Sequence, residues 1–328
     1  MQRIEDKARE FKNIEILFQH RARRLITNPS TGRVLGVTVE AKNKTMNFKA
    51  SKAVVIATGG FGRNREMIIE YGERYVDCIP TMAPGHLGDG LKMALDAGAA
   101  TKHIGHSVVS SLPVCDTTKS DRPYFAVVFG GVTVNLNGKR FYDESCPKGY
   151  YGNLTDAALD EPEAQFFIIY DSKIRIHPVV LPCVSSAKEY SADTWEELAK
   201  AAGIKDPGLF AQTMKKYNED VESEGYDTVF GRKYLQSVNG EPIPVDTPPY
   251  YAVKCHPSLT SFKGGLKINT RSQVINNYGE VISGLYAIGE VTGGLVGKGT
   301  YLGGLMWPAS MTFGRLVGRS VAFETAEE

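Results

Sequence analysis

The apolar and polar positions of the first sixty residues predict one helix followed by strands. Residues 3–11 predict a short charged helix, and the compact apolar run at 14–18 predicts a buried strand. Residues 33–40 and 46–50 predict two further strands of a small β-meander. The almost continuously apolar run at 53–57 ends in a glycine-rich bend, and it predicts a central strand buried on both faces.

Helical spacing returns later in the chain. Residues 91–97 predict a helix whose first turn Asp89 can cap. Asp193 and Glu196 have the spacing of a capping box and predict the start of another helix. Two more helices are predicted at 209–217 and 310–323, and short strands at 266–268, 274–275 and 285–288.

The composition is that of an ordinary folded chain. At about 150 residues per domain, the 328 residues predict roughly two domains. The formal net charge of +1, without blocks of like charge, disfavours a nucleic-acid partner. No apolar run approaches the roughly 20 residues that span a bilayer, and the charged N-terminus lacks the apolar stretch of a secretory signal, so a cytoplasmic location is expected.

Cysteine and histidine positions do not predict a metal site. The five cysteines are scattered singly without a CxxC pair, which fits reduced thiols better than a disulfide framework. His103 and His106 lie three residues apart, but no second ligand pair has the spacing of a metal site. We therefore interpret the two histidines as polar surface residues.

Glycine pairs close several of the predicted strands: Gly59-Gly60, Gly264-Gly265, and the cluster that begins at Gly289. Glycines at strand ends let a ligand approach the backbone closely, and ligands of open α/β sheets bind beyond such ends. A single glycine pair is more often a plain turn. A series that closes adjacent apolar strands favours a bound ligand.

Five stretches carry a more specific signal: AVVIATGGFGRNREM (53–67), HLGDGLKMALDAGA (86–99), VTVNLNGKRFYDES (132–145), YDTVFGR (226–232) and GLYAIGEVTGG (284–294). In order and spacing the chain resembles the flavoproteins of the fumarate reductase and succinate dehydrogenase type, including the 3-ketosteroid dehydrogenases. The resemblance implies an α/β (α+β) fold. A partial FAD-binding Rossmann-like domain would comprise residues 1–105 and 257–328, with an α+β substrate-capping domain at 106–256 inserted between them.

The resemblance also implies FAD as the cofactor. The Ala22 backbone would meet the adenine, and Thr58 and Gly59 would lie near the dinucleotide. Asp89 and Glu290 would hydrogen-bond the cofactor, although Asp89 is alternatively a helix cap and Glu290 a turn carboxylate. The remaining cofactor-binding positions are Ala57, Gly60, Gly265, Gly289, Leu305 and Met306.

One family feature is missing from the sequence. Family members begin with a strand, a GxGxxG turn and a helix whose N-terminal amides hold the pyrophosphate. This sequence opens on the helix that would follow that segment. We therefore expect either that a second polypeptide supplies the nucleotide-binding segment or that the chain is a truncated product.

The substrate positions depart from those of the fumarate reductases. Ser261 stands where those proteins have the histidine that would hold a carboxylate, and Tyr301 replaces the arginine of their NRLGG motif. Lys148 corresponds to their proton-donating arginine. Because a dicarboxylate needs paired cationic donors, fumarate is not expected as the substrate.

The ending of the chain resembles that of the 3-ketosteroid dehydrogenases instead. This implies that the Tyr301 hydroxyl and the Gly304 amide polarise a substrate carbonyl and stabilise the enolate. Lys148 or Tyr150 would transfer the proton, and the choice between them stays open. The plainer interpretations are a packed aromatic residue for Tyr301 and a solvated loop lysine for Lys148.

The leading hypothesis is a flavin-dependent oxidoreductase, or the catalytic subunit of a split one. It would reduce or introduce a C=C bond conjugated to a carbonyl in an apolar, steroid-like substrate, with no nucleic acid and no membrane span. The alternative is a non-catalytic remnant or scaffold subunit of the same fold that binds no flavin. A third hypothesis is a reductase of unsaturated carboxylates with relocated cationic residues.

Overall fold

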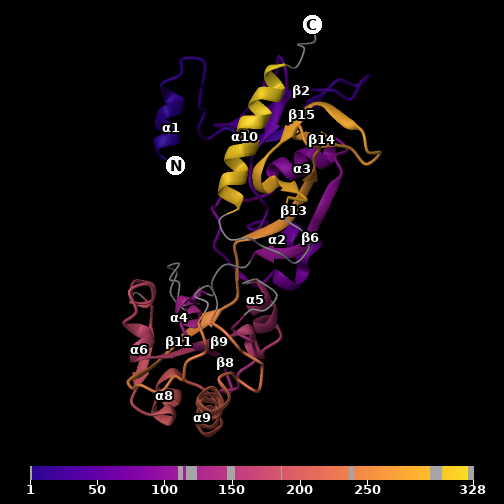
Figure 1. The fold of residues 1–328 in the computed structure, drawn as a ribbon. Helices are drawn as coiled ribbons and strands as arrows, with labels where there is room; N and C mark the ends of the chain where they lie inside the picture. The colour runs from indigo at the N-terminus through magenta and orange to yellow at the C-terminus, as the bar shows by residue number, and fades with distance from the viewer. Residues whose placement is uncertain are drawn as a thin grey trace.

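The computed structural model describes residues 2–109, 114–115, 124–145, 152–185, 187–235, 240–295 and 305–323 as a mixed α/β structure. Figure 1 shows two groups of elements at opposite ends of a long molecule. The terminal region (described residues within 2–109 and 257–323) contains the first and last elements, and the middle region (described residues within 114–256) contains the others. Each region has a hydrophobic core of its own. The exact domain boundaries given above stay a prediction.

Small sheets build the terminal region. The first is an antiparallel meander of β1 (Arg21–Thr27), β2 (Val34–Ala41) and β3 (Lys44–Lys49). The others have the orders β14 (Gln273–Ile275), β15 (Val281–Ala287), β4 (Val54–Ile56); β16 (Thr292–Gly293), β13 (Ser261–Lys267), β6 (Thr101–Val109); and β12 (Ser258–Leu259), β5 (Ile79–Pro80). The helices are α1 (Gln2–Arg9), α2 (Arg65–Gly72), η1 (Glu73–Tyr75), α3 (Asp89–Asp96), η3 (Gly289–Val291) and α10 (Met306–Ala322).

A five-stranded sheet organises the middle region. Its order is β10 (Glu189–Ala192), β11 (Tyr250–His256), β9 (Phe166–Asp171), β8 (Val132–Asn135), and β7 (Val114–Cys115) also pairs with β11. All six residues of β9 are buried, because strands pair with both of its edges and helices pack on it. The helices are α4 (Tyr124–Val128), α5 (Gly152–Leu159), η2 (Pro162–Ala164), α6 (Ser172–Arg175), α7 (Leu181–Val184), α8 (Trp195–Ala202) and α9 (Pro207–Glu224).

Most predicted elements are present, but two helix caps differ from the prediction. Thr194, not Asp193, caps α8, since the Thr194 hydroxyl accepts from the Glu197 amide at 3.3 Å and donates to the Glu197 carboxylate at 2.9 Å. The capping box therefore lies one residue later than predicted. Asp89 is the first residue of α3, and the cap position before it is Gly88, which has no side chain to bond the amides.

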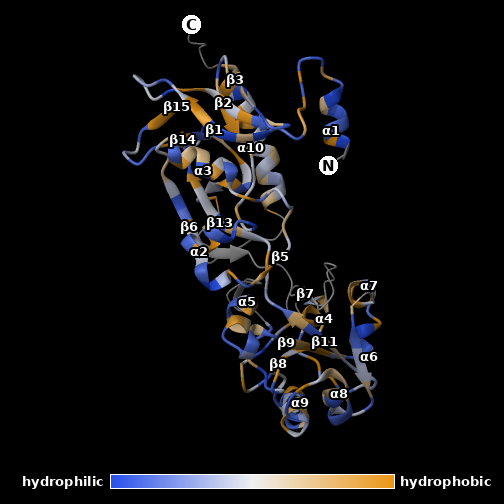
Figure 2. Cartoon of the chain, turned by 180° about the vertical axis from the view of Figure 1, so that it is seen from behind, coloured by the Kyte–Doolittle hydropathy of each residue, from blue (hydrophilic) through white to orange (hydrophobic). Residues whose placement is uncertain are grey.

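The predicted strand at 14–18 is wrong. These residues are irregular and exposed, with Phe18 62% accessible. Gln19 then takes a φ of +58°, which turns the chain before β1 starts at Arg21. A buried strand needs a neighbouring strand whose backbone pairs with its N–H and C=O groups. The described structure places no strand beside residues 14–18. Figures 1 and 2 show the mostly hydrophilic α1 to one side of α10 in both views.

Two expectations about the sheets are also corrected. The strand predicted to be central, β4, lies at the edge of its sheet, and Val55 is 38% exposed, because only β15 pairs with it among the described strands. Gly264-Gly265 does not end a strand but lies inside β13, at a register shift against β6. Gly264 has a φ of +102°, and a Cβ atom there would collide with the His103 backbone.

Within the described ranges, none of the helices combines the length and apolar character needed to span a bilayer. The same ranges contain no group of three or more His, Cys, Asp or Glu side chains that could hold a metal ion.

Candidate functional site

Two parallel strands of the terminal region end at the same edge. β4 and β15 pair with Leu285 opposite Val54 and Ala287 opposite Ile56. Since the carboxyl ends of parallel strands meet at one edge, the turns that follow them lie together. Gly59 and Gly289 open these turns with φ values of +71° and +73°, a left-handed conformation that favours glycine.

The turn after β4 packs against two polar side chains. A Cβ atom on Gly60 would lie 2.5 Å from Glu290 Oε1, and one on Gly59 would lie 3.0 Å from His86 Nε2. Neither position has room for a larger residue without movement of these side chains. The two side chains also cover the backbone that the sequence predicts as the approach for a ligand.

His86 and Glu290 face each other beside this turn. His86 Nδ1 lies 3.7 Å from Glu290 Oε2, which is longer than a hydrogen bond. In the part of the chain that the structure describes, His86 Nδ1 and Glu290 Oε1 are buried without a hydrogen-bond partner. Burial raises the pKa of Glu290, against the smaller opposing effects of a hydrogen bond with Ser261 and of the neighbouring His86. The pair is short of polar contacts.

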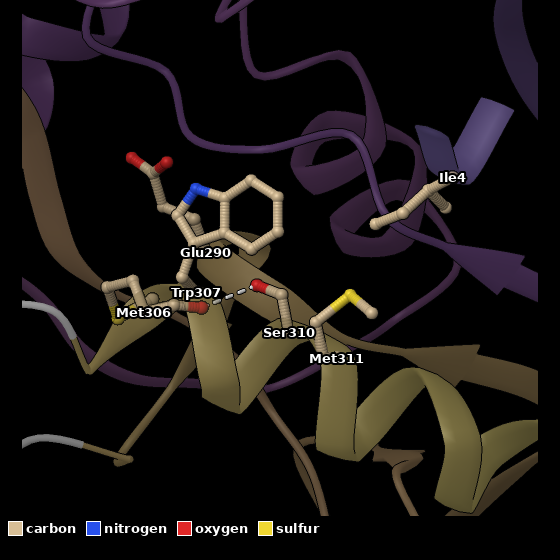
Figure 3. Close-up of a pocket in the computed structure, with 6 residues that line it drawn as sticks. All are labelled: Ile4, Glu290, Met306, Trp307, Ser310 and Met311. Carbon is tan, nitrogen blue, oxygen red and sulfur yellow. Dashed lines mark hydrogen bonds between the residues drawn. The ribbon is translucent and has the colours of Figure 1, made fainter. Parts of the chain in front are cut away.

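A mostly apolar cavity of about 460 Å³ opens beside Glu290 (Figure 3). Its lining residues come from α1, η3 and α10: Ile4, Glu290, Met306, Trp307, Ser310 and Met311. The Ser310 hydroxyl donates to the Met306 carbonyl at 2.8 Å, so this polar group is already satisfied within the helix. Glu290 supplies the charged group among these six residues, at the edge where the glycine turns meet.

Asp89 is held by an ion pair. The Arg21 guanidinium donates to both carboxylate oxygens of Asp89, at 2.7 and 2.8 Å, and thereby lowers the pKa of that carboxyl. The pair joins β1 to the first turn of α3, where Ala22 packs against the core. Thr58 reaches the same turn, since a Cβ atom on Gly90 would collide with its hydroxyl. Thr58 and Asp89 are therefore brought together at α3, and Ala22 follows Arg21 in β1.

The remaining predicted positions have different surroundings. Ala57 is exposed after β4. A Cβ atom on Gly265 would collide with the Val291 carbonyl, so this glycine allows β13 to approach the chain before β16. Leu305 precedes α10, and Met306 begins the helix and lines the cavity. Gly265 thus allows two backbone segments to pack closely, whereas Met306 lines the cavity together with Glu290.

A family model described as an FAD binding domain matches residues 1–305. The chain belongs to this FAD binding domain family. Among curated proteins, this chain is 33% identical over 289 residues to a protein of Shewanella frigidimarina (strain NCIMB 400) named "Probable fumarate reductase Ifc3". The match covers 86% of this chain and 46% of that protein.

Solved structures of the family agree with the fold. The open conformation of a flavocytochrome c3 fumarate reductase matches with a TM-score of 0.79 at 32% identity, over 98% of this chain and 54% of that one. The 3-ketosteroid-Δ4-(5α)-dehydrogenase of Rhodococcus jostii RHA1, in complex with 4-androstene-3,17-dione, matches with a TM-score of 0.69 at 27% identity, over 93% and 59%. The chain spans about half the length of the proteins it matches.

The residues at the cavity fit part of an FAD molecule. A dinucleotide needs hydrogen-bonding partners for its hydroxyl groups and apolar walls for its rings. Glu290 Oε1 has no hydrogen-bond partner among the described residues, and Trp307 and Met311 are apolar walls of the cavity that Glu290 lines. The Gly59-Gly60 backbone does not fit equally well, because the His86 and Glu290 side chains cover it.

The residues predicted to act on the substrate, Tyr301, Gly304, Lys148 and Tyr150, lie outside the described residues. The described chain that precedes residues 146–150 is fixed by buried charges. Arg140 pairs with both Glu144 and Asp227, and Arg232 Nη1 lies 3.9 Å from Glu144 Oε2. Arg232 also donates to the Gly131 carbonyl at 2.9 Å.

The sequence interpretation missed His86, Trp307 and Lys263. His86 is a polar residue inside the conspicuous HLGDG stretch, and Trp307 follows the predicted Met306 directly. Lys263 is 5% exposed, and burial lowers its pKa to about 8. A lysine between Phe262 and Gly264-Gly265 was the available signal for the last of these.

Proposed function

We propose that the protein is part or all of a flavin-dependent oxidoreductase that reduces or introduces a C=C bond conjugated to a carbonyl group. One observation carries this proposal: in a member of the FAD binding domain family, the turn after β4 packs against Glu290 of the turn after β15, and Glu290 and the start of α10 line one mostly apolar cavity. FAD is the proposed cofactor, and when bound it supplies hydride chemistry.

The protein's own residues would hold the substrate and move the proton. The Tyr301 hydroxyl and the Gly304 amide would donate to the substrate carbonyl oxygen and stabilise the negative charge that develops on it. Lys148 or Tyr150 would exchange the proton at the neighbouring carbon. The buried charges around Arg140 and Glu144 fix the described chain that leads to Lys148.

We propose an apolar carbonyl compound, steroid-like in character, as the substrate class. The matched Rhodococcus jostii RHA1 dehydrogenase holds such a ketone. Ser261 and Tyr301 replace the cationic side chains that a dicarboxylate needs. Lys263 is the specific observation in favour of the other class, unsaturated carboxylates, because it places a cationic side chain two residues after Ser261.

A scaffold subunit that binds no flavin is the competing function. The side chains of His86 and Glu290 cover Gly59 and Gly60 at the edge where the dinucleotide is proposed to lie. A scaffold needs no open backbone there. The two proposals differ in whether the purified protein takes up FAD.

The test is uptake of FAD followed by turnover. The full chain, alone and co-expressed with any polypeptide encoded next to it, is incubated with FAD, and bound flavin is measured by visible absorbance after gel filtration. Loaded protein is assayed with a reduced viologen dye against a conjugated steroid ketone and an unsaturated acid. We expect bound flavin and turnover of the ketone.

Tyr301 provides the matched variant. Tyr301→Phe should lower turnover of the ketone by about a hundredfold if its hydroxyl stabilises the developing charge. Tyr278→Phe is the control, since Tyr278 is 89% exposed on a turn. Colourless protein in every preparation would support the scaffold, and unchanged turnover in Tyr301→Phe would remove that hydroxyl from the mechanism.

A further inference from the structure

We propose that Cys115 and Cys255 are a redox pair that closes to a reversible disulfide between β7 and β11. This modification site lies in the middle region, and it does not depend on the proposed function. The two cysteines are far apart in the sequence, and the sheet brings them together. The co-reactant is a small disulfide of the glutathione class.

The register of the five-stranded sheet places the two cysteines opposite each other. β7 and β11 are antiparallel, with Cys115 the direct partner of Cys255 and Val114 that of His256. Directly opposed residues of antiparallel strands lie on the same face of the sheet, with Cα atoms about 4.5 or 5.5 Å apart. A disulfide spans Cα distances of about 4.4–6.8 Å. The two backbone positions therefore suit a crosslink.

The two cysteines lie on strands with different support. β11 pairs with β9 from Tyr250 to Cys255, while β10 and β7 follow one another along its other edge. Cys255 is fully buried, and its thiol donates to the Val253 carbonyl at 3.5 Å. β7 has two residues and, among the described strands, pairs with β11 alone. Because short edge strands open more readily than core strands, the co-reactant should reach Cys115 first.

The chemistry is thiol–disulfide exchange in two steps. The Cys115 thiolate attacks one sulfur of oxidised glutathione, which forms a mixed disulfide and releases one reduced glutathione. The Cys255 thiolate then attacks the Cys115 sulfur, which forms the bond between the two cysteines and releases the second reduced glutathione. The two protein thiols lose two electrons and two protons, and oxidised glutathione gains them. A dithiol reductant reverses both steps.

The crosslink would join the two connections between the regions. In the described chain, β7 is the first element after β6 of the terminal region, and β11 is the last before β12. Figure 2 shows β7 on the side of the middle region that faces the terminal region. A bond between Cys115 and Cys255 closes a loop that contains almost the entire middle region. Since a crosslink across a long loop restricts the unfolded chain, oxidation should stabilise this region.

Thiol counting tests the crosslink. The full chain is equilibrated with oxidised glutathione, quenched in acid, unfolded and alkylated, and the alkylated cysteines are counted by mass spectrometry. We expect two of the five cysteines to be protected, a peptide crosslink between Cys115 and Cys255, and full alkylation after treatment with dithiothreitol. Cys255→Ala should instead accumulate a glutathione adduct on Cys115, because the second thiol is missing. Cys183→Ser is the matched control and should keep the crosslink, since Cys183 is a partly exposed cysteine of α7.

Thermal unfolding supplies the second measurement. The Trp195 ring stacks on Tyr250 of β11 at 3.6 Å, so its fluorescence reports on this sheet in a Trp307→Phe background. Oxidation should raise the unfolding midpoint of the chain with both cysteines by about 5 °C or more. It should leave the midpoint of Cys115→Ala unchanged.

A chain without the Cys115–Cys255 crosslink after equilibration with excess oxidised glutathione would overturn the proposal. An unfolding midpoint that falls on oxidation would also overturn it, because the native strands would then not accommodate the bond. If Cys255→Ala fails to fold by circular dichroism, Cys115→Ala serves for the thiol count, since it leaves the buried thiol of Cys255 in place. None of these readouts requires bound flavin, so failure here and failure of the proposed function are distinguishable.

Discussion

Two glutamates, one in each region of the molecule, have opposite surroundings: Glu144 is fully buried, and Glu290 is partly buried. In the middle region, Glu144 is fully buried and accepts from the Thr133 amide at 2.7 Å, from the Thr133 hydroxyl at 2.9 Å and from Arg140. In the terminal region, Glu290 bonds to Ser261 and otherwise faces His86 beyond hydrogen-bond distance. One carboxylate is saturated with donors, and the other is left short of them.

The difference indicates separate roles for the two carboxylates. A buried charge that is paired on all sides contributes to a fixed structure, and removing its partner is costly. A buried carboxylate with few donors next to a cavity costs stability and is retained where a ligand completes its contacts. Glu144 is therefore expected to be structural, and Glu290 to serve binding.

Arg140→Leu should have the largest effect. It leaves Glu144 and Asp227 without their shared guanidinium, and breaking a buried pair costs about 3–5 kcal/mol. The free energy of unfolding of the middle region is measured by urea titration with Trp195 fluorescence in a Trp307→Phe background. Lys215→Ala is the control, because the Lys215 side chain is 74% exposed. Its ion pair with Glu219, at 3.7 Å, contributes less than about 1 kcal/mol to stability. Equal effects of the two variants would contradict the structural role of Glu144.

Local patterns were sufficient to predict much of the fold. The strands at β2 and β3 and the helices α9 and α10 follow from their own residues, and all are present. The prediction of a strand at 14–18 was wrong. Its apolar composition is typical of a strand, but no described strand lies beside it. The exposed edge of β4 could not be predicted either, since a strand's neighbours depend on the whole topology.

The candidate site was predicted in part for the same reason. Glu290 and Met306 lie in or next to conspicuous motifs and do line the cavity. His86 was missed because it reaches Glu290 only through the packing of its loop on the Gly59 turn, a contact between distant parts of the sequence. Asp89 was predicted to cap α3 or to hydrogen-bond the cofactor. It does not cap the helix, and its partner Arg21 comes from β1.

Tyr75→Phe should have a smaller effect, at the contact between the regions. The Tyr75 hydroxyl donates to Asp156 of α5 at 2.7 Å, and Arg74 donates to Asp160 at 2.8 Å. The variant leaves the half-buried Asp156 carboxylate without that donor, at a cost of about 1 kcal/mol. Unfolding of the terminal and middle regions, followed separately by Trp307 and Trp195, should then diverge. Superimposable transitions in the variant would show that this contact does not couple the regions.

Glu290→Gln should have the smallest effect on stability, and a favourable one. Burial raises the pKa of the folded Glu290 above its unfolded value of about 4.3. As the pH rises, the carboxyl of the unfolded state therefore loses its proton before that of the folded state. Above the unfolded pKa the buried carboxyl lowers the free energy of unfolding, and below it the carboxyl does not. The variant should gain less than about 1 kcal/mol at neutral pH and nothing in acid. Thermal unfolding across this range measures the gain, with Glu66→Gln as the exposed control. A gain that persists in acid would show that charge at Glu290 is not its cause, and the contrast with Glu144 would then rest on geometry alone.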